Sequence, residues 1–122
     1  MIGESMFNPE FWKDRRVFVT GHTGFKGSWL CLWLNHVGAK VTGYALEPPT
    51  DPSLFELARI SELSDHHTGD VRHLESLEEA LRVARPEVVF HMAAQSLVLY
   101  SYEEPVETFS TNVLGTVHLL DA

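Results

Sequence analysis

Cysteine is nearly absent from this chain, since Cys31 is the only one among 122 residues. A single cysteine excludes a disulfide within the chain and suits a reducing compartment. No apolar run approaches the roughly 18 residues of a membrane-spanning helix. Met1–Glu10 lacks the basic and apolar regions of a signal peptide. We therefore expect a cytoplasmic protein with no membrane partner.

Basic residues are also scarce: the chain has 9 lysines and arginines against 17 aspartates and glutamates, and a net charge of −8 at pH 7. This balance excludes the basic surface that nucleic-acid binding needs, so we expect no nucleic-acid partner. An anionic cofactor is still compatible with it, because a helix dipole and a few donors act locally. The histidines, including His66, His67 and His73, show no tetrahedral metal-ligand spacing, so we expect no metal site.

Three glycines, Gly21, Gly24 and Gly27, follow one another with the spacing G-x-x-G-x-x-G. An apolar, β-branched segment over Arg16–Thr20 precedes them, and apolar residues at helical spacing follow over Phe25–Val37. This order predicts a strand, a tight turn and a helix whose N-terminus holds a phosphate group. The motif predicts a dinucleotide-binding turn, and the alternative is an ordinary connection between strand and helix.

The turn does not match the phosphate-binding loop of nucleoside triphosphatases. That loop has a glycine directly before Lys-Ser, whereas Phe25 precedes Lys26 and Gly27 separates it from Ser28. A lysine in the first helical turn opposes the helix dipole. Lys26 therefore either contacts a bound phosphate or extends into water. We also expect modest cofactor binding, because His22 places a bulky imidazole in the turn and Ala45 ends the second strand without a carboxylate.

Strand-like and helix-like segments alternate along the chain. The expected strands are Arg16–Thr20, Lys40–Ala45, His66–Thr68 and Val88–Met92. The expected helices are Phe25–Val37, a short one that begins at Ser53 with a capping box, His73–Ala84, and a long one from Pro105. Such alternation implies a parallel sheet of strand order 3-2-1-4 with a ligand crevice at the carboxyl ends of strands one and four. The expected fold class is α/β, a Rossmann-type doubly wound sheet.

The pattern stops at Ala122 without a glycine or proline stop. We therefore expect the front of a longer protein. Residues 1–15 would be an N-terminal lead-in, and residues 16–122 would be the N-terminal part of an NAD-binding Rossmann domain, with the first four strands. The rest of that domain and a substrate domain would be absent from this chain.

Several apolar residues have an expected place in the core. Trp29 and Trp33, four residues apart, are expected on the buried face of the first long helix. Gly38 is expected as the left-handed cap of that helix. The fourth strand is apolar enough to be buried on both faces. The last helix has one apolar face, formed by Val106, Phe109, Val113, Val117 and Leu120.

The end of the second strand bears on the choice between NAD and NADP. A carboxylate there binds the ribose 2′-hydroxyl, whereas an arginine accommodates a 2′-phosphate. Ala45 stands at this position, and Glu47 follows two residues later. No lysine or arginine occurs over residues 42–58, which favours NAD. Glu47 is either a displaced ribose ligand or a solvated loop charge.

Residues after the third and fourth strands would contact the adenine side of the cofactor. Asp70 can accept a hydrogen bond from the adenine amino group while Val71 packs on the ring; alternatively, Asp70 caps the helix that follows. Ala93 and Ala94 are small enough to let the cofactor lie against the backbone, or to let a helix pack closely on the sheet.

Four segments carry a family resemblance: T-G-H-T-G-F-K-G-S-W-L from Thr20, G-D-V-R from Gly69, F-H-M-A-A-Q from Phe90 and T-N-V-L-G-T from Thr111. Together they resemble the extended short-chain dehydrogenase/reductase family, which includes NAD-dependent epimerases and dehydratases. The resemblance implies a bound NAD and a structural asparagine at Asn112. From the turn and from the resemblance, the expected cofactor-binding residues are Gly21, His22, Thr23, Gly24, Phe25, Lys26, Gly27, Asp70, Val71, Ala93, Ala94 and Gln95.

Within this family, the glycine turn and Tyr44-Ala45-Leu46 look most like sugar-nucleotide 4,6-dehydratases that act on CDP-glucose. The resemblance implies a nucleotide-sugar substrate, CDP-glucose, and a homo-oligomeric lyase of polysaccharide biosynthesis. NAD would take a hydride from C4 of the sugar, water would leave across C5 and C6, and the hydride would return to C6. The product would be CDP-4-keto-6-deoxyglucose.

The family's catalytic Tyr-x-x-x-Lys pair is absent, because no lysine follows Tyr44, Tyr100 or Tyr102 at that spacing. In the family the tyrosine deprotonates the C4 hydroxyl and the lysine lowers its pKa. We therefore expect no catalytic residue in this chain and no activity from it alone. Leu99-Tyr100 also stand where the family pattern has an arginine. Two alternatives are another NAD-dependent nucleotide-sugar epimerase or dehydratase, and a non-catalytic dinucleotide-binding module that senses redox state.

Overall fold

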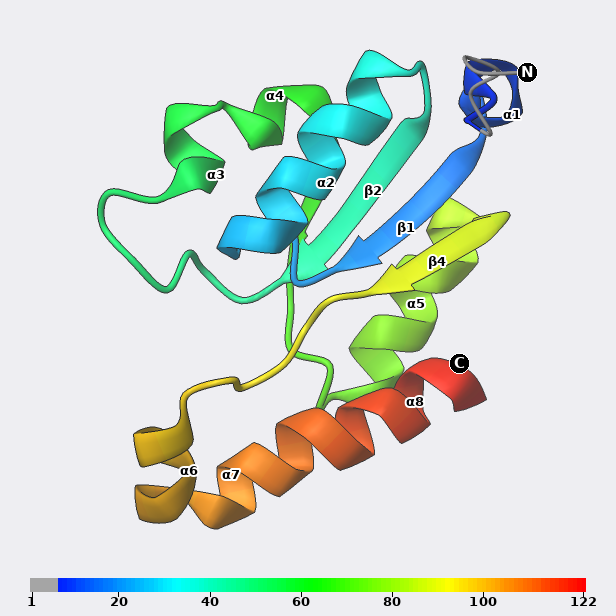
Figure 1. Cartoon of the computed structure of the whole chain (residues 1–122). Helices are drawn as coiled ribbons and strands as arrows, with labels where there is room; N and C mark the ends of the chain where they lie inside the picture. Colours follow the sequence, from blue (N-terminus) through cyan, green and yellow to red (C-terminus); the bar gives the residue numbers. More distant parts are fainter. Residues whose placement is uncertain (1–6) are drawn as a thin grey trace, which may run out of the picture.

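The computed structural model describes residues 7–122. Its centre is a sheet of four parallel strands in the order β3-β2-β1-β4 (Figure 1). The strands are β1 (Arg16–Thr20), β2 (Lys40–Ala45), β3 (Asp65–Thr68) and β4 (Val88–His91). The predicted fold class and strand order are confirmed, and the first and last residues of each strand lie within one residue of the predicted ones.

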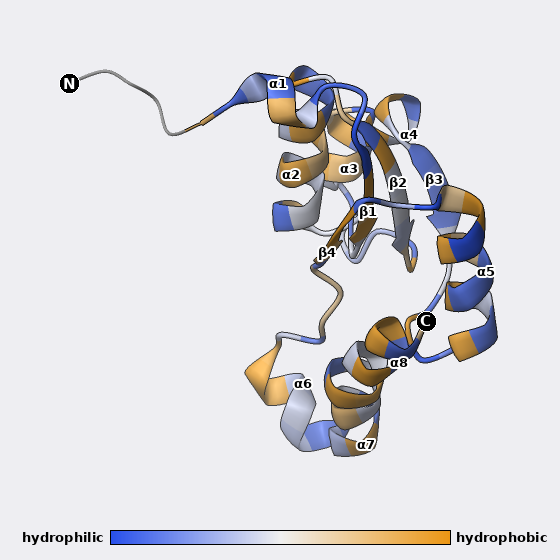
Figure 2. Cartoon of the chain, turned by 90° about the vertical axis from the view of Figure 1, so that its right-hand side faces the viewer, coloured by the Kyte–Doolittle hydropathy of each residue, from blue (hydrophilic) through white to orange (hydrophobic). Residues whose placement is uncertain are grey.

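Helices cover both faces of the sheet (Figures 1 and 2). α2, α3 and α4 lie on one face, and α5 and α8 lie on the other. The helical segments are α1 (Pro9–Trp12), α2 (Phe25–His36), α3 (Leu54–Leu57), α4 (Ile60–Leu63), α5 (Leu74–Ala84), α6 (Val98–Glu103), α7 (Pro105–Phe109), the π-helical turn η1 (Ser110–Leu114) and α8 (Gly115–Asp121). The sequence pattern missed α1, α4 and α6, because such short helices show no clear periodicity.

One cluster of apolar side chains lies between the sheet and the helices α2 to α4, and we call it the α2-side cluster. Its buried members are Val17, Val19, Cys31, Leu34, Ala39, Val41, Phe55 and Ile60. α2 buries the small residues Gly27, Ser28 and Cys31 together with Leu34, so the helix approaches the sheet closely. Gly38 follows the C-cap of α2 and has a φ of +88°, the left-handed conformation that the sequence predicts there.

The prediction that Trp29 and Trp33 are core residues is wrong, because their side chains are 51% and 39% exposed. The glycine turn decides which face of α2 meets the sheet, since it brings Gly27 against the backbone of Gly21. Indole rings do not fit in a gap that glycine and serine line. Trp33 instead packs edge-on against Trp12 of α1, with 5.9 Å between ring centroids.

The opposite face of the sheet carries a smaller group of buried residues, the α5-side cluster: Phe18, Tyr44, Val71 and Leu77. Alternation along β1 sends Phe18 to this face and both neighbouring valines to the other. The prediction that β4 is buried on both faces is wrong, because none of its four residues is fully buried and β4 also lies at an edge of the described sheet. Its residue Val89 is 42% exposed.

The predicted helix from Pro105 forms as the consecutive segments α7, η1 and α8. The residues that the structure describes do not cover its apolar face (Figure 2). The exposed fractions are 78% for Val106, 68% for Phe109, 51% for Val113, 51% for Val117 and 83% for Leu120. No helix within residues 7–122 is both long enough and apolar enough to span a membrane.

Candidate functional site

The fold requires two of the three glycines in the β1–α2 turn. Gly21 has a φ of +76°, and a Cβ there would lie 2.6 Å from the backbone nitrogen of Ala93. A Cβ on Gly27 would collide with the carbonyl oxygen of Gly21. Backbone therefore packs directly against backbone in this turn, which only glycine allows.

Gly24 differs from both, because the fold leaves space beside it. Its φ is −78°, and a Cβ would meet the Gly21 carbonyl oxygen at 3.5 Å, which is an ordinary contact. Gly24 is the N-cap of α2, and no side chain caps this helix end. The N–H groups and the positive dipole end of α2 thus face a space that an anionic group such as a pyrophosphate fits.

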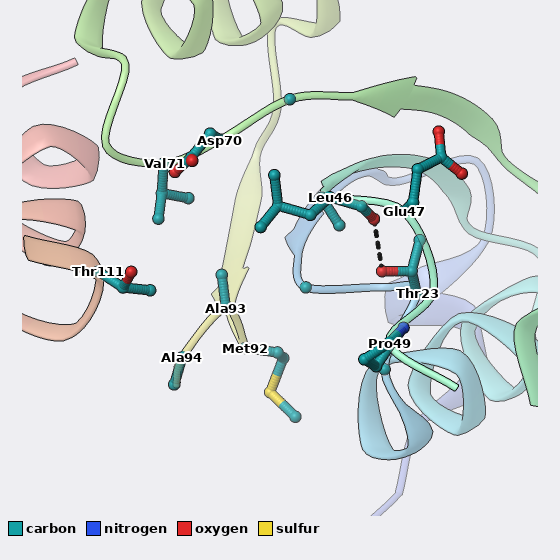
Figure 3. A pocket seen from close by; sticks show the side chains of 14 residues that line it. Thr23, Leu46, Glu47, Pro49, Asp70, Val71, Met92, Ala93, Ala94 and Thr111 are labelled. Carbon is teal, nitrogen blue, oxygen red and sulfur yellow. Dashed lines mark hydrogen bonds between the residues drawn. The ribbon is translucent and has the colours of Figure 1, made fainter. Parts of the chain in front are cut away.

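A cleft of about 210 Å³ opens beside this turn, at the carboxyl ends of all four strands (Figure 3). It is lined by seven of the predicted residues: Gly21, Thr23, Gly24, Asp70, Val71, Ala93 and Ala94. It is also lined by Ala45, Leu46, Glu47, Pro49, Gly69, Met92 and Thr111. The volume lies below the roughly 300–1,000 Å³ of a complete small-molecule pocket, so the cleft suits one end of a dinucleotide.

The other predicted cofactor-binding residues lie outside the cleft. Phe25 and Lys26 are exposed on the first turn of α2, and Gly27 is buried beneath it. The side chain of Gln95 instead contacts α7, where its Nε2 donates a hydrogen bond to the Thr108 hydroxyl at 3.0 Å. Contacts of these residues with a cofactor stay predictions.

The imidazole of His22 also points away from the cleft and is fully buried, at 0% exposure. It packs against Gly43 of β2, and its Nε2 lies 2.7 Å from Nδ1 of His66 on β3. The ring does not crowd the turn, because Gly43 gives it room on the α2 side of the sheet, and modest cofactor binding stays a prediction. Burial, and then the neighbouring His66 and His67, lower the pKa of His22 to about 4, so the ring is neutral at pH 7.

The loop after β2 forms one rim of the cleft. The Thr23 hydroxyl donates a hydrogen bond to the carbonyl oxygen of Leu46 at 2.8 Å, which ties this loop to the glycine turn (Figure 3). The Thr68 hydroxyl donates to the Glu47 carboxylate at 3.3 Å. A carboxylate therefore lies at the rim where the ribose of a dinucleotide would bind.

Asp70 lies on the opposite side of the cleft and is held by Arg72. Its carboxylate accepts hydrogen bonds from the Arg72 backbone N–H at 2.9 Å and from the guanidinium at 2.6 Å. Burial alone would raise the pKa of Asp70, but the hydrogen bonds from Arg72 outweigh it and hold the pKa below its usual value. The alternative role of Asp70 as the cap of α5 is wrong, because His73 is the N-cap of that helix.

Thr20 and His91 fix the loop after β4, and sequence reasoning missed both. The Thr20 hydroxyl is fully buried, and its oxygen accepts hydrogen bonds from the N–H groups of Met92 and Ala93 at 3.1 Å each. It also lies 2.7 Å from Nδ1 of His91, whose Nε2 is 3.1 Å from the Thr116 hydroxyl. No local sequence signal marks these pairs, because the partners come from different elements.

Asn112 joins the same loop to the C-terminal helix. Its Oδ1 accepts from the N–H of Gln95 at 2.7 Å, and its Nδ2 donates to the Gln95 carbonyl at 2.9 Å. This is a structural role of the kind expected for Asn112. The residue lies in η1, and its neighbour Thr111 lines the cleft. Such π-helical turns often occur at functional sites.

The fold and the site together define a class of protein. A parallel α/β sheet leads from its first strand, through a glycine turn, to an uncapped helix N-terminus beside a cleft at the strand ends. This arrangement is that of a Rossmann-type dinucleotide-binding domain.

Comparison with known proteins narrows this class. Residues 18–122 match the model of the family described as GDP-mannose 4,6 dehydratase. The CDP-glucose 4,6-dehydratase of Salmonella typhimurium is 60% identical over 116 residues, which cover 95% of this chain and 32% of that protein. GDP-mannose 4,6 dehydratase 2 of Caenorhabditis elegans is 32% identical, over 90% of this chain and 31% of that protein. The chain belongs to the GDP-mannose 4,6 dehydratase family, and it spans about a third of the length of these relatives.

A solved structure agrees with this assignment. The UDP-glucose-4-epimerase from Stenotrophomonas maltophila, with bound NAD and formylated UDP-arabinopyranose, has a TM-score of 0.76 and 28% sequence identity to this chain. The match covers 88% of this chain and 32% of that one. The family and this neighbour confirm the predicted resemblance to the epimerases and dehydratases of nucleotide sugars.

Proposed function

We propose that this chain is the NAD-binding part of a sugar-nucleotide 4,6-dehydratase that converts CDP-glucose to CDP-4-keto-6-deoxyglucose. The observation that carries the proposal is the open space at Gly24, where the fold itself does not need a glycine but a bound pyrophosphate would. The 60% identity to the relative named CDP-glucose 4,6-dehydratase supports CDP-glucose over other nucleotide sugars.

The cleft supports one placement of NAD. The pyrophosphate would lie against Gly24 and the N-terminus of α2. The adenine would lie between Leu46 and Val71, whose side chains enter the cleft from two different loops, and Asp70 would accept from its amino group (Figure 3). Ala93 offers only a methyl group, so the cofactor would lie close to the loop after β4.

Glu47 and the lack of nearby cations support NAD over NADP. The Glu47 carboxylate would accept a hydrogen bond from the ribose 2′-hydroxyl, and its charge would repel a 2′-phosphate. The hydrogen bond from Thr68 orients this carboxylate at the rim of the cleft. No lysine or arginine over residues 42–58 offsets that charge.

When bound, NAD would accept a hydride from C4 of the sugar and return it at C6. This chain's own residues bind and orient the cofactor, and Thr20 and Asn112 fix the loop beneath it. The sequence has no Tyr-x-x-x-Lys pair, so the group that takes the C4 hydroxyl proton would lie outside this chain. We further propose that the protein is cytoplasmic. We also propose that it is a homo-oligomer, which the exposed apolar face of α7, η1 and α8 supports.

The proposal is tested by giving the full-length protein NAD with CDP-glucose, GDP-mannose or UDP-glucose. We expect a 4-keto sugar, detected by its absorbance in alkali, from CDP-glucose far faster than from the other two. A C4 epimer without a keto product would instead indicate an epimerase. NAD binding without turnover of any sugar nucleotide would favour a non-catalytic sensor.

A further inference from the structure

The side chain of His22 fills a closed space between β2, β3 and α3. A Cβ on Gly43 would collide with the ring, so the glycine at this position of β2 creates the space. The ring of Phe55 packs edge-on at 5.4 Å between centroids, and His66 Nδ1 lies 2.7 Å from His22 Nε2. Three separate elements thus converge on one residue of the glycine turn.

The backbone of His22 belongs to the phosphate-binding turn itself. Its carbonyl oxygen accepts a hydrogen bond from the buried Ser28 hydroxyl at 2.8 Å. Its neighbours Gly21 and Thr23 both line the cleft. Because the ring is held from outside the turn, its contacts restrain the backbone that would face a pyrophosphate.

The ring of His22 is neutral at pH 7, and its Nε2 lies within hydrogen-bond distance of Nδ1 of His66. Nδ1 of His22 is buried and has no hydrogen-bond partner among the described residues. With its proton on Nε2, the ring leaves only a lone pair unpaired, whereas a protonated ring would leave an N–H without an acceptor. The titratable groups that face it are His66 and His67 on β3; Phe55 of α3 and Gly43 of β2 do not ionise.

We propose that His22, anchored by His66 and by the space at Gly43, is a positioning residue that holds the turn in its NAD-binding conformation. This inference rests on the proposed NAD binding. The ring does not line the cleft, so it acts through the backbone of the turn. Loss of the anchor should therefore lower the affinity for NAD and leave the affinity for the sugar nucleotide unchanged.

The test compares His22→Leu with His22→Gln in the full-length protein. Leucine fills the space but cannot bond to His66, whereas glutamine can place an amide near the position of Nε2. We expect His22→Leu to weaken NAD binding about three- to tenfold, the size of one neutral hydrogen bond, and His22→Gln to restore most of it. Calorimetric titrations with NAD and, separately, with CDP-glucose measure both affinities.

The matched control is His67→Leu, because the printed partner of the His67 ring is Asp65, at 3.1 Å, and His67 acts on His22 only through its charge. This variant should bind NAD like the wild type. Gly43→Ala is a second variant, for the case that His22→Leu does not fold, because the added Cβ displaces the ring and should cause the same selective loss.

Wild-type NAD affinity in His22→Leu, or equal losses of NAD and CDP-glucose affinity in step with a lower thermal midpoint, would overturn the positioning role. A wild-type protein that binds no NAD would refute the proposed function instead.

Discussion

The two faces of the sheet differ in how completely helices cover them. On the α2 side, three helices and two strands enclose a continuous core in which Leu34 and Ile60 are fully buried, at 0% exposure. On the α5 side, Phe18 and Leu77 are equally buried. However, the apolar face of α7, η1 and α8 is exposed, and Leu120 of α8 is 83% exposed (Figure 2). The glycine turn packs with α2, so the phosphate end of the site has the better supported core.

This difference follows the order of the chain. β1, α2, β2, α3 and α4 are consecutive in sequence, and they supply the α2-side cluster. The α5-side cluster draws on Phe18, Tyr44, Val71 and Leu77, which come from segments further apart. The core beneath the phosphate turn therefore comes from consecutive elements, whereas the core beneath the adenine side of the cleft draws on segments further apart.

The largest expected effect is on the free energy of unfolding. We compare two variants of the 122-residue chain, Leu34→Ala and Leu120→Ala. Leu34→Ala removes a fully buried side chain and should lower the free energy of unfolding by about 2–5 kcal/mol. Leu120→Ala should change it by less than about 0.5 kcal/mol, because that side chain is already exposed. Urea unfolding measures both, and equal losses would mean that the two faces are packed alike.

Lowering the pH should reduce the free energy of unfolding through a group on each side of the sheet, and the two groups act over different pH ranges. The pKa of His22 falls from 6.5 to about 4 on folding. As the pH falls, the unfolded state therefore takes up a proton on His22 at a higher pH than the folded state does. Stability should therefore decline as the pH drops from 6.5 to 4, by at most about 3 kcal/mol. The pKa of Asp70, beside the α5-side cluster, is lowered, so its contribution is present above pH 3.8 and is lost as the pH falls below that value.

The pH dependence is measured by urea unfolding of the wild type and of His22→Gln at a series of pH values. The variant should lose the decline between pH 6.5 and 4 and keep the decline at lower pH. An unchanged slope between pH 6.5 and 4 would show that His22 is not the group responsible.

Gly24→Val tests whether the turn binds a ligand rather than only connecting two elements. The fold leaves space for a side chain there, so helix content should survive, but a pyrophosphate would no longer fit. We expect NAD affinity to fall by at least about tenfold. Far-ultraviolet circular dichroism and NAD titration give the two readouts.

The matched variant for this test is Gly21→Ala, which should damage the fold as well, because its Cβ would meet backbone atoms at 2.6 Å and a φ of +76° disfavours alanine. Retained NAD affinity in a folded Gly24→Val protein would mean that the glycine spacing is structural only.

The smallest expected effect concerns the rim of the cleft. Glu47→Gln removes the charge but keeps the shape, and it should weaken NAD binding by about 1 kcal/mol while improving NADP binding. Titration of both cofactors gives the ratio of their affinities. The same ratio in the variant and the wild type would show that Glu47 is a solvated loop charge.

The sequence was most informative where structure depends on nearby residues. Gly21, Gly24 and Gly27 predicted the turn, and the strand order followed from the alternation of strands and helices. Periodicity could not show which face of α2 meets the sheet, so it put Trp33 in the core although the side chain is 39% exposed. That face depends on how the turn packs.

The site was only partly predictable for a related reason. Asp70, Val71 and Ala93 were found because strand ends are recognisable and share one edge of a parallel sheet. The anchoring of Thr20 to the loop after β4, the pairing of His22 with a ring on β3, and the π-helical turn all depend on contacts between distant segments. No single stretch of sequence encodes them.

A crystal structure of the full-length protein with NAD tests most directly whether the end of α2 beside Gly24 holds the cofactor. We predict pyrophosphate oxygens within hydrogen-bond distance of the first-turn N–H groups of α2, and the adenine between Leu46 and Val71. A pyrophosphate bound away from Gly24, or an adenine outside that cleft, would contradict this assignment of the site.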